Sequence, residues 1–306
     1  METFTSLAGV YAAAITPMRS DFTPDLEAVP VYLDFLARRG CHGALLLGTT
    51  GEGPSFAPDE RVAIFRAASQ VRQVHPEFRL LAGTGTPSLT ETVTITRAAF
   101  SLGMDGVVVL PPYYYRNASQ DGLFNWFAEV LRQAVPDGGA LFGYNIPPVT
   151  GVPLPLDLLS RLKDGYPNRF AGLKDSSGED MFARQLGERF GRDLIILTGN
   201  DRLFSLALEM GAYGCITAMA NVASPILRET YDAHQGGQDY GDIQQRLNAV
   251  RDVMEHYPPA PPLLKALLPG RYDLPTWTVR PPLMPLIPEF AQKAAVELED
   301  VLGEGR

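Results

Sequence analysis

Short apolar runs alternate with longer segments of helical period over most of the chain. Eight of these runs are apolar throughout, which is typical of parallel strands buried on both faces. They cover residues 9–16, 43–47, 80–83, 106–110, 141–145, 170–174, 194–198 and 214–217. Helical patterns fill the gaps, from Pro58 onward and at 88–102, 120–134, 155–163, 180–190 and 203–210. The alternation predicts an α/β fold, a (β/α)8 TIM barrel.

The pattern changes after residue 224. Helical runs at 242–256 and 289–302 flank a proline-rich stretch at 258–288 that has no strand pattern. We therefore expect two domains, a catalytic barrel over 1–224 and a C-terminal helical extension over 225–306 packed on it. An open, doubly wound sheet that binds a dinucleotide is the alternative. It is supported by GTG at 83–85, but Ser88 stands where that fingerprint needs its third glycine.

Composition narrows the classes of function. A hydrophobic share of 45% with 20% charged residues is ordinary for a globular protein. The net charge of -9, without a run of Lys and Arg, argues against nucleic acid or an anionic membrane as partner. Cys41 and Cys215 have apolar neighbours, so we expect reduced core thiols in a cytoplasmic protein. The first residues lack the basic start of a signal peptide, and no apolar run approaches the roughly 18 residues that span a bilayer. The scattered histidines predict no metal site.

Lysine is rare in this chain, since only four of the 26 basic residues are lysines. Lys174 ends the apolar run at 170–174, and in a barrel the carboxyl ends of the strands carry the active site. Burial disfavours the charged form of an amine, and a neutral amine can attack a ketone to form a Schiff base. The iminium is then an electron sink for the adjacent carbon–carbon bond. A lysine that leaves the strand into solvent, or that pairs with Asp175, is the ordinary structural alternative.

Hydroxyl groups follow two other predicted strands at the same end. Tyr144 lies near the end of the run at 141–145, and Thr49 and Thr50 stand in the segment GTTGEG. A Schiff-base lyase must move protons, and a phenol with neighbouring hydroxyls can relay them. The backbone at Gly48 and the nearby glycines can cradle a carboxylate. Singly, these residues are equally typical of a packed tyrosine and a capped turn, but their common place favours a site.

Six segments, GTTGEG, PPYYYRNASQDGL, GYNIPP, GLKDSS, TGND and GCITAMANV, occur in this order over residues 8–225. Together they resemble the dihydrodipicolinate synthase / N-acetylneuraminate lyase family, whose members are class I pyruvate-dependent aldolases. The resemblance implies a TIM barrel and a metal-free Schiff-base mechanism with pyruvate that needs no cofactor. It also implies a homotetramer or homodimer that acts on small molecules.

The resemblance also implies roles for individual residues. Lys174 resembles the Schiff-base lysine, and Tyr144 resembles the proton-relay tyrosine. Thr49 and Thr50 resemble the hydroxyl pair that contacts the carboxylate of the 2-oxo acid and links the relay. The implied catalytic set is therefore Lys174, Tyr144 and Thr50, joined by a tyrosine from another subunit.

Tyr114 is the best match for that tyrosine, although the YYY run leaves the register open by one residue. Gly199 and Ile216 match positions that line the pyruvate pocket. One position departs from the pattern, because Val149 stands where dihydrodipicolinate synthases carry an arginine for the carboxylate of aspartate semialdehyde. A valine cannot make that bidentate contact, and Arg116 is the candidate replacement.

The sequence therefore predicts a lyase that cleaves or forms a 2-oxo-3-deoxy sugar acid or another 4-hydroxy-2-oxo acid. A 4-hydroxy-tetrahydrodipicolinate synthase, which condenses pyruvate with aspartate semialdehyde, and a deoxy-sugar-acid dehydratase remain alternatives. Sialic acid lyases usually carry Ser-Thr at the positions of Thr49 and Thr50, which argues mildly against that branch. A protein that binds 2-oxo acids without turnover is an alternative of another class, but it would need no proton relay.

Overall fold

The computed structural model describes residues 2–303 and contains a closed parallel barrel in which the strands follow one another in chain order. The strands are β1 (Gly9–Ala13), β2 (Gly43–Leu46), β3 (Arg79–Gly83), β4 (Gly106–Val109), β5 (Ala140–Asn145), β6 (Phe170–Asp175), β7 (Ile195–Thr198) and β8 (Gly214–Thr217). The predicted TIM barrel is confirmed, and the open-sheet alternative is wrong. Ser88, which broke the dinucleotide fingerprint, caps a helix by accepting the Glu91 N–H at 3.3 Å.

Helices follow the strands along the chain. They are α1 (Ala28–Arg38), α2 (Pro58–Ala68), α3 (Leu89–Ser101), α4 (Gln120–Ala134), α5 (Pro147–Thr150), α6 (Leu156–Gly165), α7 (Asp180–Phe190) and α8 (Phe204–Glu209). Short 3-10 helices lie at η1 (Glu2–Leu7), η2 (Gly53–Ser55), η3 (Ser69–Gln73) and η4 (Asp201–Leu203). The helical patterns predicted between the strands are confirmed, whereas α1 and α5 were not predicted.

The C-terminal part holds α9 (Ala220–Gln235), α10 (Gly241–His256), α11 (Ala260–Tyr272) and α12 (Pro288–Leu302). The runs predicted for α10 and α12 are confirmed. Helix α11 was missed because it lies in the proline-rich stretch. Pro261 and Pro262 stand in its first turn, where backbone N–H groups have no partner within the helix, so proline is tolerated there. Helix α9 is bent at Ala223, two residues before Pro225.

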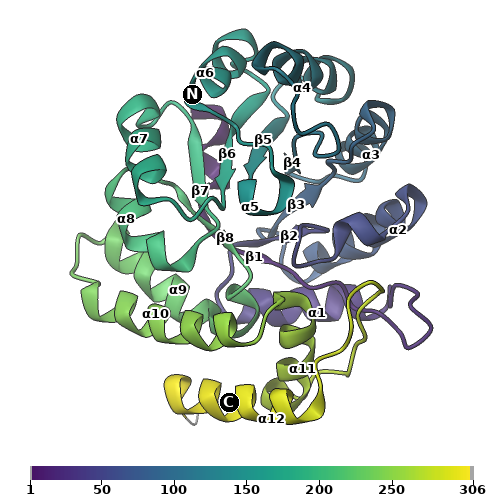
Figure 1. Cartoon of the computed structure of the whole chain (residues 1–306), viewed down its shortest axis with the longest axis vertical. Helices are drawn as coiled ribbons and strands as arrows, with labels where there is room; N and C mark the ends of the chain where they lie inside the picture. Colours follow the sequence, from purple (N-terminus) through teal and green to yellow (C-terminus); the bar gives the residue numbers. More distant parts are fainter. Residues whose placement is uncertain (1, 304–306) are drawn as a thin grey trace. The chain divides into compact units, whose positions relative to one another are not determined.

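The chain divides into two compact units that differ from the predicted domains. One unit comprises the chain up to Gly9 together with Arg79–Ile216. The other comprises Val10–Phe78 together with the chain from Thr217 onward. In the first unit α3 packs on α4, α4 on α6, and α7 on α8 (Figure 1). In the second unit α11 packs on α9 and α12, and α10 packs on the same two helices (Figure 1). The domain boundary at residue 224 stays a prediction.

The strands are apolar because both of their faces are covered, and nearly every strand residue is buried. Cys41 and Cys215 are buried and are not joined in a disulfide, as predicted. Burial raises the pKa of the Cys41 thiol to about 12, which suits a packing role and not a nucleophile. Over residues 2–303, none of the helices is long and apolar enough to cross a bilayer.

Candidate active site

Lys174 and Tyr144 lie side by side on neighbouring strands. Strands β5 and β6 are paired in parallel, and the register sets Tyr144 directly opposite Lys174. The Lys174 Nζ atom lies 4.0 Å from the centre of the Tyr144 ring. Both side chains are buried, at 3% and 4% exposed. The structure therefore brings together the two residues predicted as nucleophile and proton relay.

Lys174 points to the face of the sheet opposite α7 and α8. Asp175 and Thr198 line a small cavity together with residues of those helices, and successive side chains of a strand point to opposite faces. The Asp175 carboxylate accepts the Asn145 side-chain N–H at 2.8 Å and the Ser177 hydroxyl at 3.0 Å. Burial raises the pKa of Asp175 despite these donors. Asp175 is therefore not the counter-ion of Lys174, and the ordinary alternative of an ion pair between them fails.

The two buried lysines of the chain differ in their partners. Lys265 Nζ lies 2.6 Å from a carboxylate oxygen of Glu52 and donates to the Thr278 carbonyl at 2.6 Å. Burial lowers the pKa of the Lys265 amine, and the Glu52 carboxylate opposes this effect. For Lys174, the described part of the chain offers Nζ neither a hydrogen bond nor an ion pair. A buried amine without such partners contributes little to stability, so its place calls for a chemical reason.

The segment after β2, residues 48–53, is called here the threonine loop. It is flanked and closed by left-handed residues, since Leu47 has φ 55° and Glu52 has φ 56°. Such backbone costs about 1–3 kcal/mol at each non-glycine residue and is concentrated at functional sites. A Cβ atom on Gly53 would lie 2.0 Å from the Leu47 carbonyl oxygen, so only glycine fits there. The Gly53 N–H donates to the Gly48 carbonyl at 3.0 Å and completes the turn.

The two threonines of this loop have different surroundings. Thr49 is exposed, whereas Thr50 is only 7% exposed. Within residues 2–303 the Thr50 hydroxyl has no hydrogen-bond partner. The next peptide is held in place, because the Thr16 hydroxyl donates to the Gly51 carbonyl at 2.6 Å. The buried Thr50 hydroxyl is thus free to bind a ligand, which would remove the cost of leaving it unpaired.

Arg280 joins the C-terminal segment to the start of α2. Its guanidinium binds both carboxylate oxygens of Glu60, at 2.9 and 2.8 Å, in the bidentate geometry that favours arginine. It also donates to the carbonyls of Ser55 and Phe22, both at 2.6 Å. The residues just after the threonine loop are therefore held by the Arg280 side chain, which is more than two hundred residues away in the sequence.

Glu60→Gln is expected to lower the free energy of unfolding by about 1.5–3 kcal/mol at neutral pH. The hydrogen bonds from Arg280 hold the pKa of Glu60 below its ordinary value. A lowered carboxyl pKa contributes stability above the unfolded-state value near 4.5, and this stability is lost as the pH falls through the folded-state value. Urea unfolding of both proteins at several pH values measures the difference. A difference that does not shrink in acid would contradict the account.

Three further predicted residues lie near strand ends or within a strand. Gly199 follows β7 and donates its N–H to the Asp175 carbonyl at 2.6 Å. A Cβ atom there would lie 1.9 Å from the Ser176 hydroxyl oxygen, which explains the glycine. Ile216 is fully buried in β8. Tyr114 is 76% exposed and its ring meets that of Tyr115 edge-on, with centres 5.3 Å apart.

The loops after β4 and β5 meet at Arg116 and Gly151. The Arg116 Cδ atom lies 2.9 Å from the place that a Cβ atom on Gly151 would occupy, so the side chain packs on the glycine backbone. Val149, in the neighbouring α5, is 57% exposed. Arg116 therefore places a cation at Gly151, two positions after Val149, where the synthases that the sequence resembles carry an arginine.

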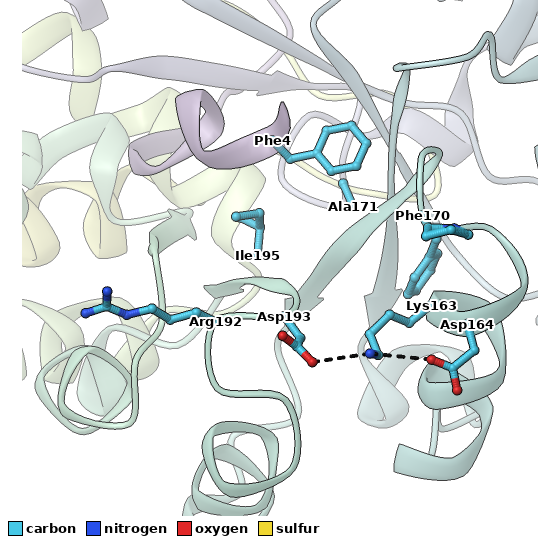
Figure 2. A pocket seen from close by; sticks show the side chains of 9 residues that line it. Phe4, Lys163, Asp164, Phe170, Ala171, Arg192, Asp193 and Ile195 are labelled. Atoms are coloured by element: carbon cyan, nitrogen blue, oxygen red, sulfur yellow. Dashed lines mark hydrogen bonds and ion pairs between the residues drawn. The ribbon is translucent and has the colours of Figure 1, made fainter. Parts of the chain in front are cut away.

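A cavity of about 340 Å³ lies at the opposite end of β6 and β7 from Lys174 (Figure 2). Phe170 and Ile195, the first residues of those strands, line it with Phe4. Lys163 also lines the cavity and forms ion pairs with Asp193 at 3.3 Å and with Asp164 at 3.4 Å (Figure 2). Barrel active sites lie at the carboxyl ends of the strands, so this cavity is not the active site.

Among the described residues, no group of His, Cys, Asp and Glu side chains is arranged to hold a metal ion.

Several residues that shape the site were not predicted. Asn145 holds Asp175 and also accepts the Leu154 N–H at 3.0 Å, which fixes the end of β5. Lys265 and Arg280 both donate to the Glu52 carboxylate of the threonine loop. A signal for Lys265 was present, because it is one of only four lysines and stands in the apolar run PPLLKALL.

Comparison with known proteins gives a consistent result. The model of the Dihydrodipicolinate synthetase family matches residues 6–301. An uncharacterized DapA-like lyase of Chloroflexus aurantiacus is 41% identical over 293 residues, which cover 94% of this chain and 96% of the relative. A 4-hydroxy-tetrahydrodipicolinate synthase of Corynebacterium urealyticum is 34% identical over 237 residues, 77% of this chain and 75% of the relative.

A solved structure agrees over nearly the whole chain. It is YagE, a prophage protein of the dihydrodipicolinic acid synthase family from E. coli K12, in complex with pyruvate. The two chains are 25% identical and superpose with a TM-score of 0.90 over 96% of this chain and 98% of YagE. The family match and the 41% identical relative extend over the barrel and the C-terminal helices alike. The chain therefore belongs to the dihydrodipicolinate synthetase family, and it is a lyase of that family.

Proposed function

We propose that this lyase is a class I, pyruvate-dependent aldolase that forms a Schiff base through Lys174. The observation that carries the proposal is the buried Lys174 amine, which has no ion pair or hydrogen bond in the described chain and lies 4.0 Å from the Tyr144 ring. Pyruvate bound to YagE supports a 2-oxo acid as ligand of the family. The proposed substrate is a 2-oxo-3-deoxy sugar acid or another 4-hydroxy-2-oxo acid.

The first proposed step is attack of the Lys174 amine on the C2 ketone, which gives a carbinolamine. Loss of water from it leaves an iminium ion. Tyr144 passes the proton lost by the attacking amine to the C2 oxygen, and a second proton, taken up from water, lets the C2 hydroxyl leave as water. The Tyr144 ring packs beside Lys174 Nζ because the two residues lie opposite each other on neighbouring strands.

Carbon–carbon cleavage follows from the iminium. The hydroxyl on C4 loses its proton, the C3–C4 bond breaks, and its electron pair enters the iminium to give an enamine and an aldehyde. The enamine takes up a proton at C3, and water then hydrolyses the pyruvate iminium to free pyruvate and the Lys174 amine. We assign carboxylate binding to Thr50, Thr49 and the backbone at Gly48, and the pocket wall to Gly199 and Ile216. This scheme uses no metal and no organic cofactor.

The residue at position 149 favours an uncharged hydroxyaldehyde as the second small molecule of the reaction, beside pyruvate. Val149 offers no charge to a second carboxylate. A buried carboxylate without its partner costs roughly 2 kcal/mol, which is about thirtyfold in affinity. The alternative is a 4-hydroxy-tetrahydrodipicolinate synthase in which Arg116, packed on Gly151, binds the carboxylate of aspartate semialdehyde.

A substrate panel separates these functions. Cleavage of 2-oxo-3-deoxy sugar acids is expected to have a kcat/KM at least about tenfold above that of pyruvate condensation with aspartate semialdehyde. Pyruvate release and semialdehyde consumption are measured with the same enzyme preparation. Preference for aspartate semialdehyde, lost in Arg116→Ala, would favour the synthase. Conversion of the sugar acid without pyruvate release would favour a dehydratase, and binding without any turnover would favour the non-catalytic alternative.

For the assembly and location, we propose a homotetramer or homodimer in the cytoplasm that binds only small molecules. The support is the family membership and the exposed Tyr114, which a second subunit could cover. Tyr114 is proposed to complete the proton relay of a neighbouring subunit.

A further inference from the structure

We propose that Lys265 and Arg280 are positioning residues that hold the threonine loop in the shape that binds the 2-oxo acid carboxylate. This inference rests on the proposed function, because it assigns the carboxylate to Thr50 and the adjacent backbone. The residues lie in the C-terminal helical part, outside every segment that carried the family resemblance. The C-terminal helical part thus supports a loop to which the proposed function assigns carboxylate binding.

The connection is a fully buried ion pair that ends in the loop itself. The Glu52 side chain is 0% exposed and that of Lys265 is 2% exposed. One Glu52 oxygen accepts Lys265 Nζ at 2.6 Å, and the other accepts the Arg280 backbone N–H at 2.9 Å. Lys265 in turn donates to the Thr278 carbonyl at 2.6 Å. One carboxylate oxygen is therefore occupied by α11 and the other by the segment that follows it.

The placement of Glu52 shows what this connection controls. Glu52 has left-handed backbone with φ 56°, and its N–H donates to the Thr49 carbonyl at 3.1 Å. Residues in this conformation persist only where their surroundings hold them. Because the Glu52 side chain turns toward Lys265 and Arg280, it is not free to bind substrate. It holds the loop, and Thr50 two positions earlier presents the unpartnered hydroxyl.

The Arg280 side chain also fixes the residues that follow the threonine loop. Its guanidinium binds Glu60 and the Ser55 carbonyl, and it lies 4.4 Å from the centre of the Phe56 ring. Residues 52–60 are thus held by one short segment from both ends. Losing either contact frees the loop to relax, which would displace the Thr50 hydroxyl and the backbone N–H groups from the carboxylate.

The test compares Lys265→Met and Glu52→Gln with the wild type. Glutamine has nearly the shape of glutamate but presents only one oxygen, so either Lys265 or the Arg280 N–H then faces an NH2 group. Each protein is reduced with borohydride at increasing pyruvate concentration, and the Lys174 peptide is quantified by mass spectrometry. We expect half-saturation of the adduct to need about tenfold more pyruvate in K265M and a smaller increase in E52Q, with the adduct still on Lys174.

Two control variants separate positioning from general destabilisation. Lys293→Met removes an exposed lysine whose partners, the Glu289 carboxylate and the Phe290 ring, both lie in α12, so it should leave half-saturation unchanged. Leu247→Ala opens a cavity in α10 at a fully buried position and should lower the melting temperature without moving half-saturation.

The outcomes separate this inference from the proposed function. Absence of any adduct in the wild type overturns the proposed function. The positioning role alone is overturned if the wild type forms the adduct and E52Q and K265M reach half-saturation at the same pyruvate concentration as the wild type. A shift in L247A equal to that in K265M overturns it as well. If K265M does not fold, E52Q decides the question in the same way.

Discussion

Replacing Lys174 by methionine is expected to abolish turnover, with kcat lower by on the order of 10⁵-fold, and to remove the borohydride-trapped adduct. Methionine fills a similar volume but has no amine to attack the ketone, so the covalent route is lost entirely. Loss of a nucleophile in other covalent enzymes costs comparable factors. Steady-state pyruvate release and the mass of the reduced protein measure the two effects.

The same variant should remain folded, which distinguishes a chemical from a structural role. Lys174 is 3% exposed, and the described chain gives its amine no ion pair or hydrogen bond. Removing it leaves no buried charge unpaired, so the free energy of unfolding is expected to stay equal or rise. Lys265→Met instead strands the Glu52 carboxylate and is expected to lose about 3–5 kcal/mol. Wild-type turnover in K174M, or a large loss of its stability, would contradict these roles.

Tyr144→Phe is expected to lower kcat by about 10²–10⁴-fold. Phenylalanine keeps the ring beside Lys174 Nζ and therefore the packing, but it removes the hydroxyl that transfers protons. The adduct with pyruvate should still form on Lys174, at a slower rate, because the nucleophile is intact. Single-turnover measurements of adduct formation and of pyruvate release resolve the two steps.

Tyr213→Phe is a matched control, since it removes a tyrosine hydroxyl that donates only to the Arg192 carbonyl at 3.3 Å. Its kcat should equal that of the wild type. If Y144F on the best substrate were as active as this control, the relay assignment would fail.

The sequence predicted the barrel because buried parallel strands are apolar on both faces and leave a clear pattern. Lys174 was predictable because a lysine at the end of such a run departs from that pattern. The residue directly opposite Lys174 could not be predicted, since the pairing of Tyr144 with Lys174 depends on a register shift between Leu141 and Phe142. Helix α11 was missed because it contains three prolines, which usually argue against a helix. Two of them lie in its first turn, where proline is tolerated.

The support of the threonine loop could not be predicted for a different reason. Glu52 and Lys265 are 213 residues apart, and their contact depends on how α11 packs against the rest of its unit. Neither residue belongs to a local motif that calls for the other. The glycines and threonines of the loop indicate a binding function, but the groups that hold the loop come from the fold.

Trapping the wild-type enzyme tests the central claim most directly. The enzyme is reduced with borohydride in the presence of pyruvate, digested, and analysed by peptide mass spectrometry. A pyruvyl adduct on Lys174, absent from Lys265 and from samples without pyruvate, is the predicted result. Folded enzyme that carries no adduct at saturating pyruvate, or carries it on another lysine, would contradict the Schiff-base function.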